Sequence, residues 1–398
     1  MKFCFAFILL CFQFSGLQAQ WKKISSGTSQ DLYDIQMIGQ NGYIAGQNST
    51  VLKSTDSGKN WKSVQLTIPC NLRALHFLDS SVGFVTGENA RIQKTYNGGK
   101  TWVQKYVRTA AYAYAIKFSG NNGIAVGRDM LAVRSYDSGE TWQVDTTFRS
   151  DKKLNSVCIL PGGMCWAVGD SGYMIKKHLT QKKWTIVKYP GKIDLNYVSN
   201  FGDSVLIVAG GMPDSVQVGV HYNIFLKSTD SGKSWNSTNI SEMKTINTGW
   251  FFTADTGFMG GSNGIISKCY QPFNIRSQQL SGTASSLHKM FFYSHIGYIV
   301  ADGGTILRTT NYGGFGLGIS SPEKNTVIQI YPNPSQGNMM ITSEVKILSI
   351  QIDDAFGRRI MQLHGDHTET INIANKGIFF VTVHLVNGQV LRQKVLIN

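Results

Sequence analysis

The chain has 398 residues, which is enough for one large domain or two ordinary ones. Glycine is common and proline scarce, with 42 and 8 residues, as in proteins built from many strands and tight turns. The 38 basic residues exceed the 24 acidic ones and give a net charge of +14, but they are scattered along the chain. We therefore expect a solvated basic surface and no nucleic-acid partner.

The N-terminus has the pattern of a secretory signal peptide. Met1-Lys2 is followed by an apolar run from Phe3 to Leu17 and by Ala19, after which we expect cleavage. No later segment is apolar over the length that a membrane-spanning helix needs. The sequence thus predicts an exported protein with residues 1–19 as its signal and without a transmembrane segment.

Four cysteines remain after the signal: Cys70, Cys158, Cys165 and Cys269. Cys158 and Cys165 flank the turn at 161–163, so a disulfide across a hairpin is possible in an oxidising compartment. The sequence leaves this disulfide and two unpaired thiols as open alternatives. None of the spacings is typical of a metal site.

The first unit of the mature chain contains four short predicted strands, at residues 31–38, 42–46, 51–54 and 62–65. The third and fourth are joined by the turn 54–61, which has the pattern S/T-x-D-x-G-x-x-W. Aspartate can hydrogen-bond backbone amides in such a turn, glycine takes a positive φ angle, and tryptophan buries a large apolar surface. We therefore expect a structural turn.

The same turn returns at a fixed spacing, with asparagine replacing aspartate in its second copy. Successive tryptophans are 41 and 40 residues apart in the first three copies, a period typical of propellers, solenoids or arrays. The turn residues are Asp56, Gly58 and Trp61; Asn97, Gly99 and Trp102; Asp137, Gly139 and Trp142; and Asp230, Gly232 and Trp235.

The later units keep the strands and vary the turn. The fourth retains only Trp184, the fifth has an insertion at 210–222, the sixth has no such turn, and the seventh lacks a fourth strand. Trp21 lies 40 residues before Trp61, so the N-terminal strand is expected to complete the last unit and close the ring. The sequence predicts an all-β fold: a seven-bladed β-propeller over 20–316.

The repeated turn resembles the Asp-box, or BNR repeat, of sialidase-like propellers. The combination of G-Y-x-x-G, G-x-I and T-x-D-G-G-x-x-W phrases also resembles propellers related to photosystem II assembly factors. These resemblances imply the propeller fold and a general binding role, with the Asp-box far from any active site. A fold alone does not define a function.

Residues 317–325 form a Gly/Ser/Pro-rich linker, and the period is absent beyond it. Short strands then continue over 326–398, ending in a hairpin across Asn387-Gly388, and predict a small β-sandwich. Residues 331–334, 354–358 and 377–381 resemble motifs of the type A C-terminal sorting domain of the type IX secretion system. This resemblance implies delivery to the cell surface or medium, with the outer-membrane translocon as partner.

No catalytic residues emerge from the sequence, and we predict neither an enzyme nor a cofactor. The Phe-Arg-Ile-Pro motif of sialidases is absent. A glycosidase of sialidase-like type remains the alternative. A sialidase would need an arginine triad, a Tyr/Glu nucleophile pair and an acid Asp, and another glycosidase would need two carboxylates in one cleft. The carboxylates expected on the face of the second-to-third-strand loops are Glu88, Asp129, Asp170 and Asp302.

A non-catalytic binding module would use that same face. Arginine and aromatic side chains are frequent anchors of binding sites, and long loops often carry function. The ligand is expected to be a surface polysaccharide or a protein, and the insertion at 210–222 is either part of its site or a neutral insertion. The binding-face candidates are Glu88, Arg91, Arg108, Tyr112, Tyr114, Arg128, Asp129, Asp170 and Asp302.

Overall fold

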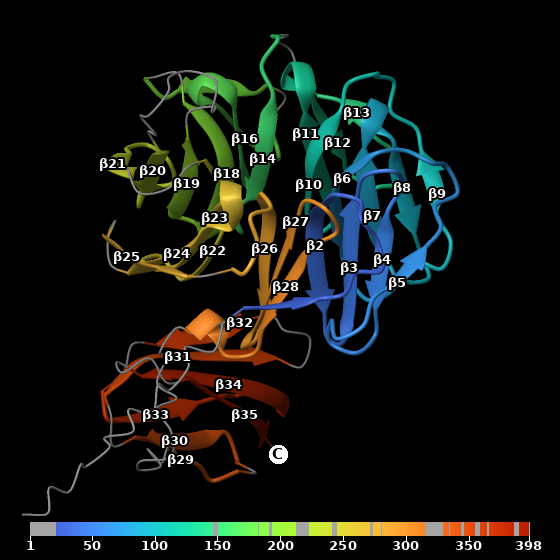
Figure 1. Ribbon diagram of the computed structural model, residues 1–398. Helices are drawn as coiled ribbons and strands as arrows, with labels where there is room; N and C mark the ends of the chain where they lie inside the picture. Colours follow the sequence, from blue (N-terminus) through green and yellow to red (C-terminus); the bar gives the residue numbers. More distant parts are fainter. Residues whose placement is uncertain are drawn as a thin grey trace, which may run out of the picture. The chain divides into compact units, whose positions relative to one another are not determined.

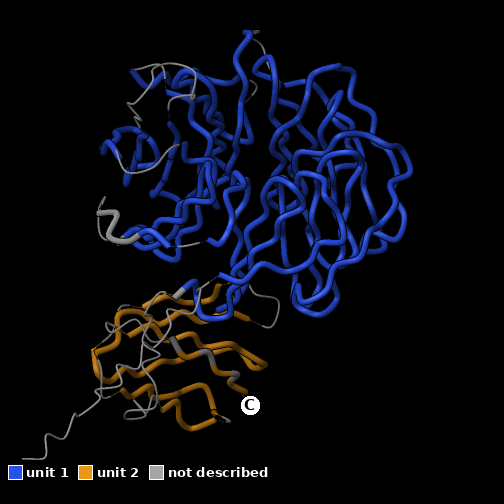
Figure 2. Tube along the Cα trace, in the orientation of Figure 1, with its two compact units in different colours: residues 1–313 blue, residues 314–398 orange. Residues whose placement is uncertain are grey.

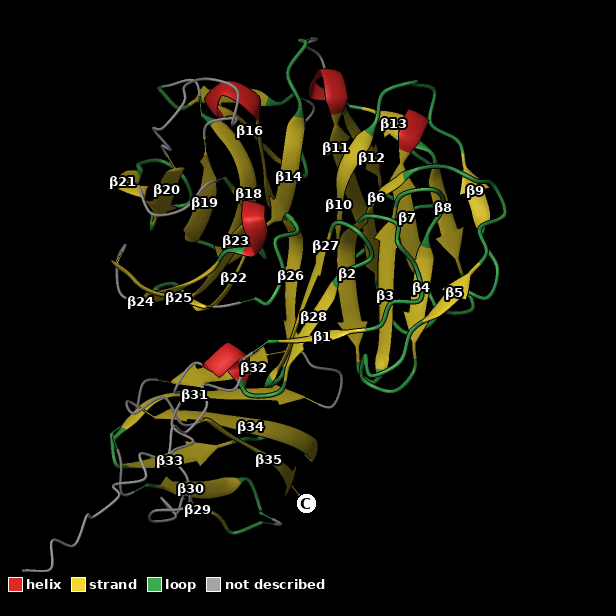
Figure 3. Cartoon of the chain, viewed as in Figure 1, coloured by secondary structure: helices red, strands yellow, loops and turns green. Residues whose placement is uncertain are grey.

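The computed structural model divides the chain into two compact units, residues 1–313 and 314–398 (Figure 2). Its secondary structure is almost entirely β, with three-residue 3₁₀ turns as the described helical segments (Figure 3). The structure describes residues 21–145, 150–181, 183–190, 193–211, 223–240, 245–270, 274–279, 281–314, 329–333, 335–343, 346–354, 359–363, 366–385 and 390–397.

The described part of the first unit contains seven four-stranded antiparallel sheets. The first three sheets comprise β2 (Leu32–Ile38), β3 (Asn41–Gly46), β4 (Val51–Ser54) and β5 (Lys62–Val64); β6 (Leu72–Phe77), β7 (Gly83–Gly87), β8 (Ile92–Thr95) and β9 (Val103–Lys105); and β10 (Ala113–Ser119), β11 (Asn122–Gly127), β12 (Ala132–Ser135) and β13 (Gln143–Val144).

The next three sheets comprise β14 (Leu154–Ile159), β15 (Met164–Gly169), β16 (Tyr173–His178) and β17 (Thr185–Lys188); β18 (Asp194–Phe201), β19 (Val205–Gly211), β20 (Asn223–Ser228) and β21 (Asn236–Ile240); and β22 (Ile246–Thr253), β23 (Thr256–Gly261), β24 (Ile266–Tyr270) and β25 (Asn274–Gln279). The last comprises β26 (Leu287–Tyr293), β27 (Ile296–Ala301), β28 (Ile306–Thr309) and β1 (Lys22–Ile24).

The first strands of the seven sheets form a closed ring. β2, β6, β10, β14, β18, β22 and β26 contact one another in that order, and β26 contacts β2 (Figure 1). β1 pairs with β28, with Lys23 opposite Leu307, so the last sheet is built from both ends of the unit. The all-β propeller and the closing role of the N-terminal strand are therefore confirmed.

The propeller core lies between adjacent sheets. One buried cluster, for example, joins Phe84 and Ile92 of the second sheet to Ile116 and Val133 of the third. In several sheets the second strand ends in a glycine. At this glycine the chain passes close to the loop that leads into the first strand of the same sheet. At Gly127 an added Cβ would overlap the Tyr112 carbonyl oxygen, so a side chain there would push the two segments apart.

Each Asp-box turn is held by hydrogen bonds from its own backbone. In the third copy the Ser135 hydroxyl donates to Asp137 Oδ1 at 2.8 Å and accepts from the Gly139 amide at 2.8 Å. The Thr141 amide and hydroxyl donate to the same carboxylate, at 2.9 and 2.6 Å. Burial opposes the charged form, but the hydrogen bonds from Thr141 prevail and lower the pKa of Asp137 to about 2.

We expect Asp137→Ala to lower the free energy of unfolding by about 1 kcal/mol, because exposed turn amides lose their acceptor. Asp137→Asn is the matched variant, since Asn97 occupies the same position in the second copy and accepts from the Thr101 amide at 2.9 Å. With a lowered folded-state pKa, the charge of Asp137 contributes stability above about pH 4, and this contribution is lost as the pH falls toward 2.

Denaturant unfolding at pH 7 and at pH 3 measures both effects. The difference in the free energy of unfolding between wild type and Asp137→Asn should shrink as the pH falls, because the aspartate loses its charge and the asparagine does not titrate. A gap that widened at pH 3 would contradict the assigned turn hydrogen bonds.

The second unit consists of two sheets around one core. The first sheet contains β29 (Gln329–Tyr331), β30 (Asn338–Thr342) and β33 (Thr368–Asn372), and the second contains β32 (Arg359–Leu363), β31 (Ile347–Asp354), β34 (Gly377–Leu385) and β35 (Val390–Ile397). Ile341 and Ile371 of the first sheet share a buried cluster with Ile350 and Val381 of the second. No helix in the described segments has the length and hydrophobicity of a membrane span.

Some sequence predictions fall outside the described residues. These are the signal peptide, the linker 317–325 and the insertion from Met212 to Tyr222. The two preceding insertion residues, Gly210 and Gly211, still belong to β19.

Candidate ligand-binding site in the propeller channel

Every first strand of the propeller has a β-bulge near its start. The pairing register shifts between Leu32 and Asp34 in β2, and likewise between Ala113 and Ala115 in β10. Corresponding shifts occur in β6, β14, β18, β22 and β26. A bulge leaves one residue unpaired and redirects its side chain.

The seven unpaired residues, here called the bulge ring, all line one cavity of about 100 Å³ at the channel entrance. The ring lies at the end of the channel near the second-to-third-strand turns: the Arg128 amide donates to the Tyr112 carbonyl just before β10. The Asp-box turns contact the opposite end, where the Ser138 amide donates to the Asn121 carbonyl. The bulge ring comprises Tyr33, Arg73, Tyr114, Asn155, Asn196, Asn247 and His288.

One side of the bulge ring is aromatic and cationic. The Arg73 guanidinium lies 3.9 Å from the centre of the Tyr33 ring, and that ring lies 4.9 Å from His288. His288 Nε2 is 2.5 Å from Asp302 Oδ1. This hydrogen bond is the main reason why the pKa of the Asp302 carboxyl is lowered. Arg73 thus stacks on an aromatic face without an ion pair to any carboxylate of the described residues.

The opposite side of the ring carries amides and one tyrosine, Tyr114. Asn155 Nδ2 is 3.1 Å from Asn196 Oδ1 and 3.2 Å from Asp170 Oδ1, and Asn196 Nδ2 donates to the Ile246 carbonyl at 2.9 Å. These bonds join three successive blades. Tyr114 stacks on Tyr112 at 6.2 Å, so the ring offers hydrogen-bonding groups and aromatic faces around one opening.

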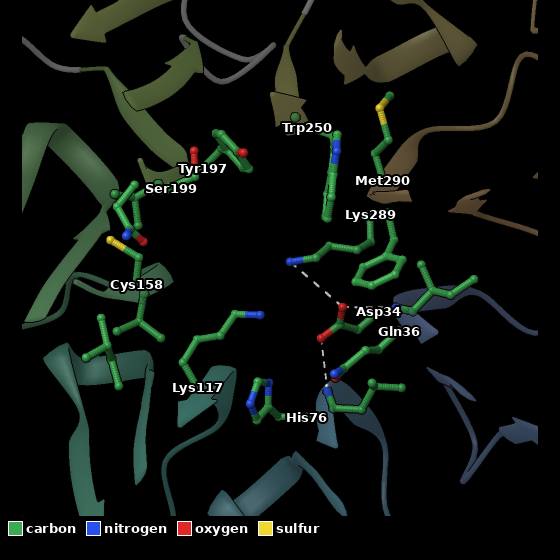
Figure 4. A pocket seen from close by; sticks show the side chains of 18 of the residues that line it. Asp34, Gln36, His76, Lys117, Cys158, Tyr197, Ser199, Trp250, Lys289 and Met290 are labelled. Carbon is green, nitrogen blue, oxygen red and sulfur yellow. Dashed lines mark hydrogen bonds and ion pairs between the residues drawn. The ribbon is translucent and has the colours of Figure 1, made fainter. Parts of the chain in front are cut away.

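A second cavity of about 350 Å³, here called the chamber, adjoins the first (Figure 4). The two cavities share the lining residues Asp34, Lys117, Val157, Tyr197 and Lys289. Among the chamber's lining residues, one side chain from each first strand occupies the position three residues after the bulge ring. These are Gln36, His76, Lys117, Cys158, Ser199, Trp250 and Phe291.

The charge balance along the two cavities is positive. Their lining residues include three basic side chains, Arg73, Lys117 and Lys289, against one carboxylate, Asp34. Asp34 is already engaged, because its oxygens accept the Ile35 and Leu75 amides at 2.9 and 3.0 Å. Lys289 Nζ is 3.8 Å from the same carboxylate.

Burial lowers the pKa values of two groups in the chamber. Desolvation, assisted by the nearby Lys289 charge, lowers the pKa of Lys117 to about 8. Desolvation, assisted by Lys117 and Lys289, lowers the pKa of His76 to about 3. At neutral pH Lys117 is therefore mostly charged and His76 is neutral.

The nine residues predicted for the binding face do not cluster at one point. One of them, Tyr114, lines a channel cavity. Arg128 lies 5.6 Å from the Tyr112 ring beside it, and Asp302 and Asp170 contact ring residues as described above. Glu88 Oε2 accepts the Asn71 amide at 3.4 Å, while Arg91 Nη1 donates to the Pro69 carbonyl at 3.0 Å.

Arg108 and Asp129 are exposed and line neither cavity. The predicted carboxylates Glu88, Asp129, Asp170 and Asp302 also do not line either cavity. The structure therefore does not gather the predicted candidates into one cleft.

The sequence did not predict that most of these residues line the channel, among them Arg73, Lys117, His288 and Lys289. A signal for them existed: the bulge ring recurs at nearly the same period as the tryptophans, with Tyr114 and Asn155 41 residues apart. The ring positions carry different residue types, however, so they form no motif.

The four described cysteines are free and buried. Cys158 pairs with Trp166 in the β14–β15 ladder and Cys165 pairs with Ile159, so the two cysteines are not directly opposite each other. Cys158 lines the chamber, whereas Cys165 belongs to a buried cluster with Val157. Among the described residues, no group of three or more His, Cys, Asp or Glu side chains could hold a metal ion.

The fold and the channel define a β-propeller protein with a small β-domain at its C-terminal end. Residues 59–156 match the family model of the photosynthesis system II assembly factor YCF48, and residues 329–398 match that of the secretion system C-terminal sorting domain. The resemblances to photosystem II assembly factor propellers and to the secretion sorting domain are confirmed. The sorting domain indicates export to the cell surface or extracellular space.

Solved structures agree on the propeller fold. YCF48 bound to D1 peptide has a TM-score of 0.60 at 19% identity, covering 73% of this chain and 97% of that one. YCF48 from Cyanidioschyzon merolae has a TM-score of 0.59 at 14% identity, covering 73% and 98%. The WD40 propeller domain of Doa1 has a TM-score of 0.57 at 9% identity, covering 72% and 96%. A search of curated protein sequences found no match.

Proposed function

We propose that the exported propeller is a non-catalytic binding module that captures an acidic segment of a protein ligand at the bulge ring. The observation that carries this proposal is Arg73, a guanidinium held against the Tyr33 ring at the channel entrance without a carboxylate partner among the described residues. Such a group suits carboxylate recognition, because its planar donors can bind both oxygens at once.

Two further features support a protein ligand. The ring amides and tyrosines supply the mixed hydrogen-bonding and aromatic surface that is typical of binding sites. One propeller of similar fold, YCF48, is described as bound to a D1 peptide. The sorting domain would bring this site to the cell exterior, with the secretion machinery as its second partner.

The lining of the channel favours binding over glycoside hydrolysis. A glycosidase requires two carboxyl groups about 5–9 Å apart across one cleft. The two channel cavities are lined by one carboxylate, Asp34, whose oxygens accept backbone amides. Hydrolysis of a glycoside by the purified protein, lost on substitution of Asp34 or Asp302, would overturn this part of the proposal.

We expect Arg73→Ala to weaken binding of an acidic peptide roughly 10- to 30-fold, as for an arginine that anchors an interface. The probe is a fluorescent peptide rich in Asp and Glu, titrated with the full chain and followed by anisotropy. The same peptide with Asn and Gln tests the charge requirement, and Lys59→Ala removes one positive charge from an exposed Asp-box turn.

The acidic peptide should bind more tightly than its amide counterpart, and Lys59→Ala should leave its affinity unchanged. Equal loss in both variants would indicate long-range attraction rather than a site at the bulge ring. Capture of polysaccharides on a glycan array, insensitive to Arg73→Ala and without peptide binding, would contradict the protein-ligand proposal.

A further inference from the structure

The chamber holds positive charge that the described residues do not neutralise. Lys117 lies on β10 and points into the cavity, with its ammonium group facing open space (Figure 4). It makes no hydrogen bond or ion pair with any described residue. Lys289 reaches into the same space from β26, and Asp34 is its 3.8 Å partner. An unpaired ammonium in a desolvated cavity is costly unless an anion joins it.

A second polar group in the chamber also lacks a partner. The Nδ1 atom of His76 is buried and has no hydrogen-bond partner among the described residues. Its ring stacks against Phe118 at 5.7 Å, which holds it beside Lys117 at the cavity wall.

The rest of the wall is largely apolar. Trp250 and Phe291 lie with ring centres 5.0 Å apart, and Val157, Leu75 and Phe118 also line the cavity. The volume of about 350 Å³ falls in the range of small-molecule sites, about 300–1,000 Å³. A ligand that fits these walls has an apolar or aromatic body and a compact anionic head.

We propose that the chamber is a binding site for a small organic carboxylate, with its head group between Lys117 and Lys289 and its apolar body against Trp250 and Phe291. The two ammonium groups supply charge-assisted hydrogen bonds. Asp34 should repel the ligand carboxylate only weakly, because two backbone amides and Lys289 already stabilise its negative charge.

Proton linkage gives this site a defined pH dependence. The anion binds the protonated form of Lys117, so affinity stays nearly constant between about pH 6 and pH 7.5, where the ligand carboxylate is ionised. It weakens as the pH rises through 8, about tenfold by pH 9. The titratable and charged groups around Lys117 come from the other first strands: Asp34 on β2, His76 on β6, Cys158 on β14, Tyr197 on β18 and Lys289 on β26. Burial raises the pKa values of Cys158 and Tyr197, which keeps both neutral in this range.

Calorimetric titration of the full chain with phenylacetate tests the proposal, with phenylacetamide as the uncharged ligand of the same shape. Phenylacetate should bind at one site per chain, at least tenfold more tightly than the amide. Lys117→Met should remove that preference, whereas Lys62→Met, an exposed lysine on the outer strand β5, should not.

Equal affinity of the wild-type protein for acid and amide would overturn the proposal, and this comparison needs no variant to fold. A preference for the acid that survives Lys117→Met in a folded variant, or an affinity that does not fall between pH 7.5 and 9, would also overturn it. The proposal does not depend on peptide capture at the bulge ring: Arg73→Ala should leave phenylacetate binding intact, so either proposal can fail alone.

Discussion

Removal of residues 326–398 should leave a folded propeller trapped in the periplasm. These residues contain the whole segment that matches the secretion system C-terminal sorting domain, residues 329–398. The described core clusters of the propeller include no residue beyond 313, and the cluster of the second unit includes none before 330. Truncation therefore removes the export signal without removing a described part of the propeller core.

The measurement is the distribution of the protein between periplasm and cell surface in a bacterium with type IX secretion. The full chain should reach the surface, and the truncated chain should lose surface display completely. Circular dichroism of the truncated protein tests whether it is folded, which separates loss of sorting from misfolding. Attaching residues 315–398 to an unrelated periplasmic protein is the reciprocal control and should export it. Surface display of the truncated chain would contradict the role assigned to the tail.

Trp21→Ala should lower the free energy of unfolding by about 3–5 kcal/mol, the usual cost of removing a large buried aromatic. Trp21 is 1% exposed and packs edge-on against Phe258 and Phe292, with ring centres 6.0 and 5.7 Å away. Its Nε1 donates to Gln279 Oε1 at 2.7 Å, which joins the closing strand to the sixth blade. Loss of this side chain weakens ring closure as well as packing.

Denaturant unfolding measures the effect, with Lys22→Ala as control. Lys22 is the exposed neighbour on β1, and its substitution should change stability by less than about 0.5 kcal/mol. If Trp21→Ala were as mild as Lys22→Ala, β1 would be an accessory strand and the ring would be closed by other contacts. The predicted signal cleavage after Ala19 leaves Trp21 near the new N-terminus, so a cleavage two residues later would have the same consequence as the substitution.

The sequence by itself determined the repeating architecture. The first three Asp-box turns recur at a nearly constant spacing because each blade must supply the same four strands. The spacing of Trp21 from Trp61 also located the closing strand, now seen paired with β28. The tail motifs are local stretches of sequence, so they too could be recognised without a structure.

Only the tertiary structure decided the site. Tyr33 and His288 are 255 positions apart in the sequence, yet their rings lie 4.9 Å apart because the closed ring brings the first and last blades together. Which side chains face the channel depends on the bulge, since a shift of one residue in register moves a side chain to the other face of its strand. The turn carboxylates prominent in the sequence remain outside the cavities, while Arg73 and Lys117, scattered among many basic residues, meet in the channel lining because their strands are neighbours in the ring.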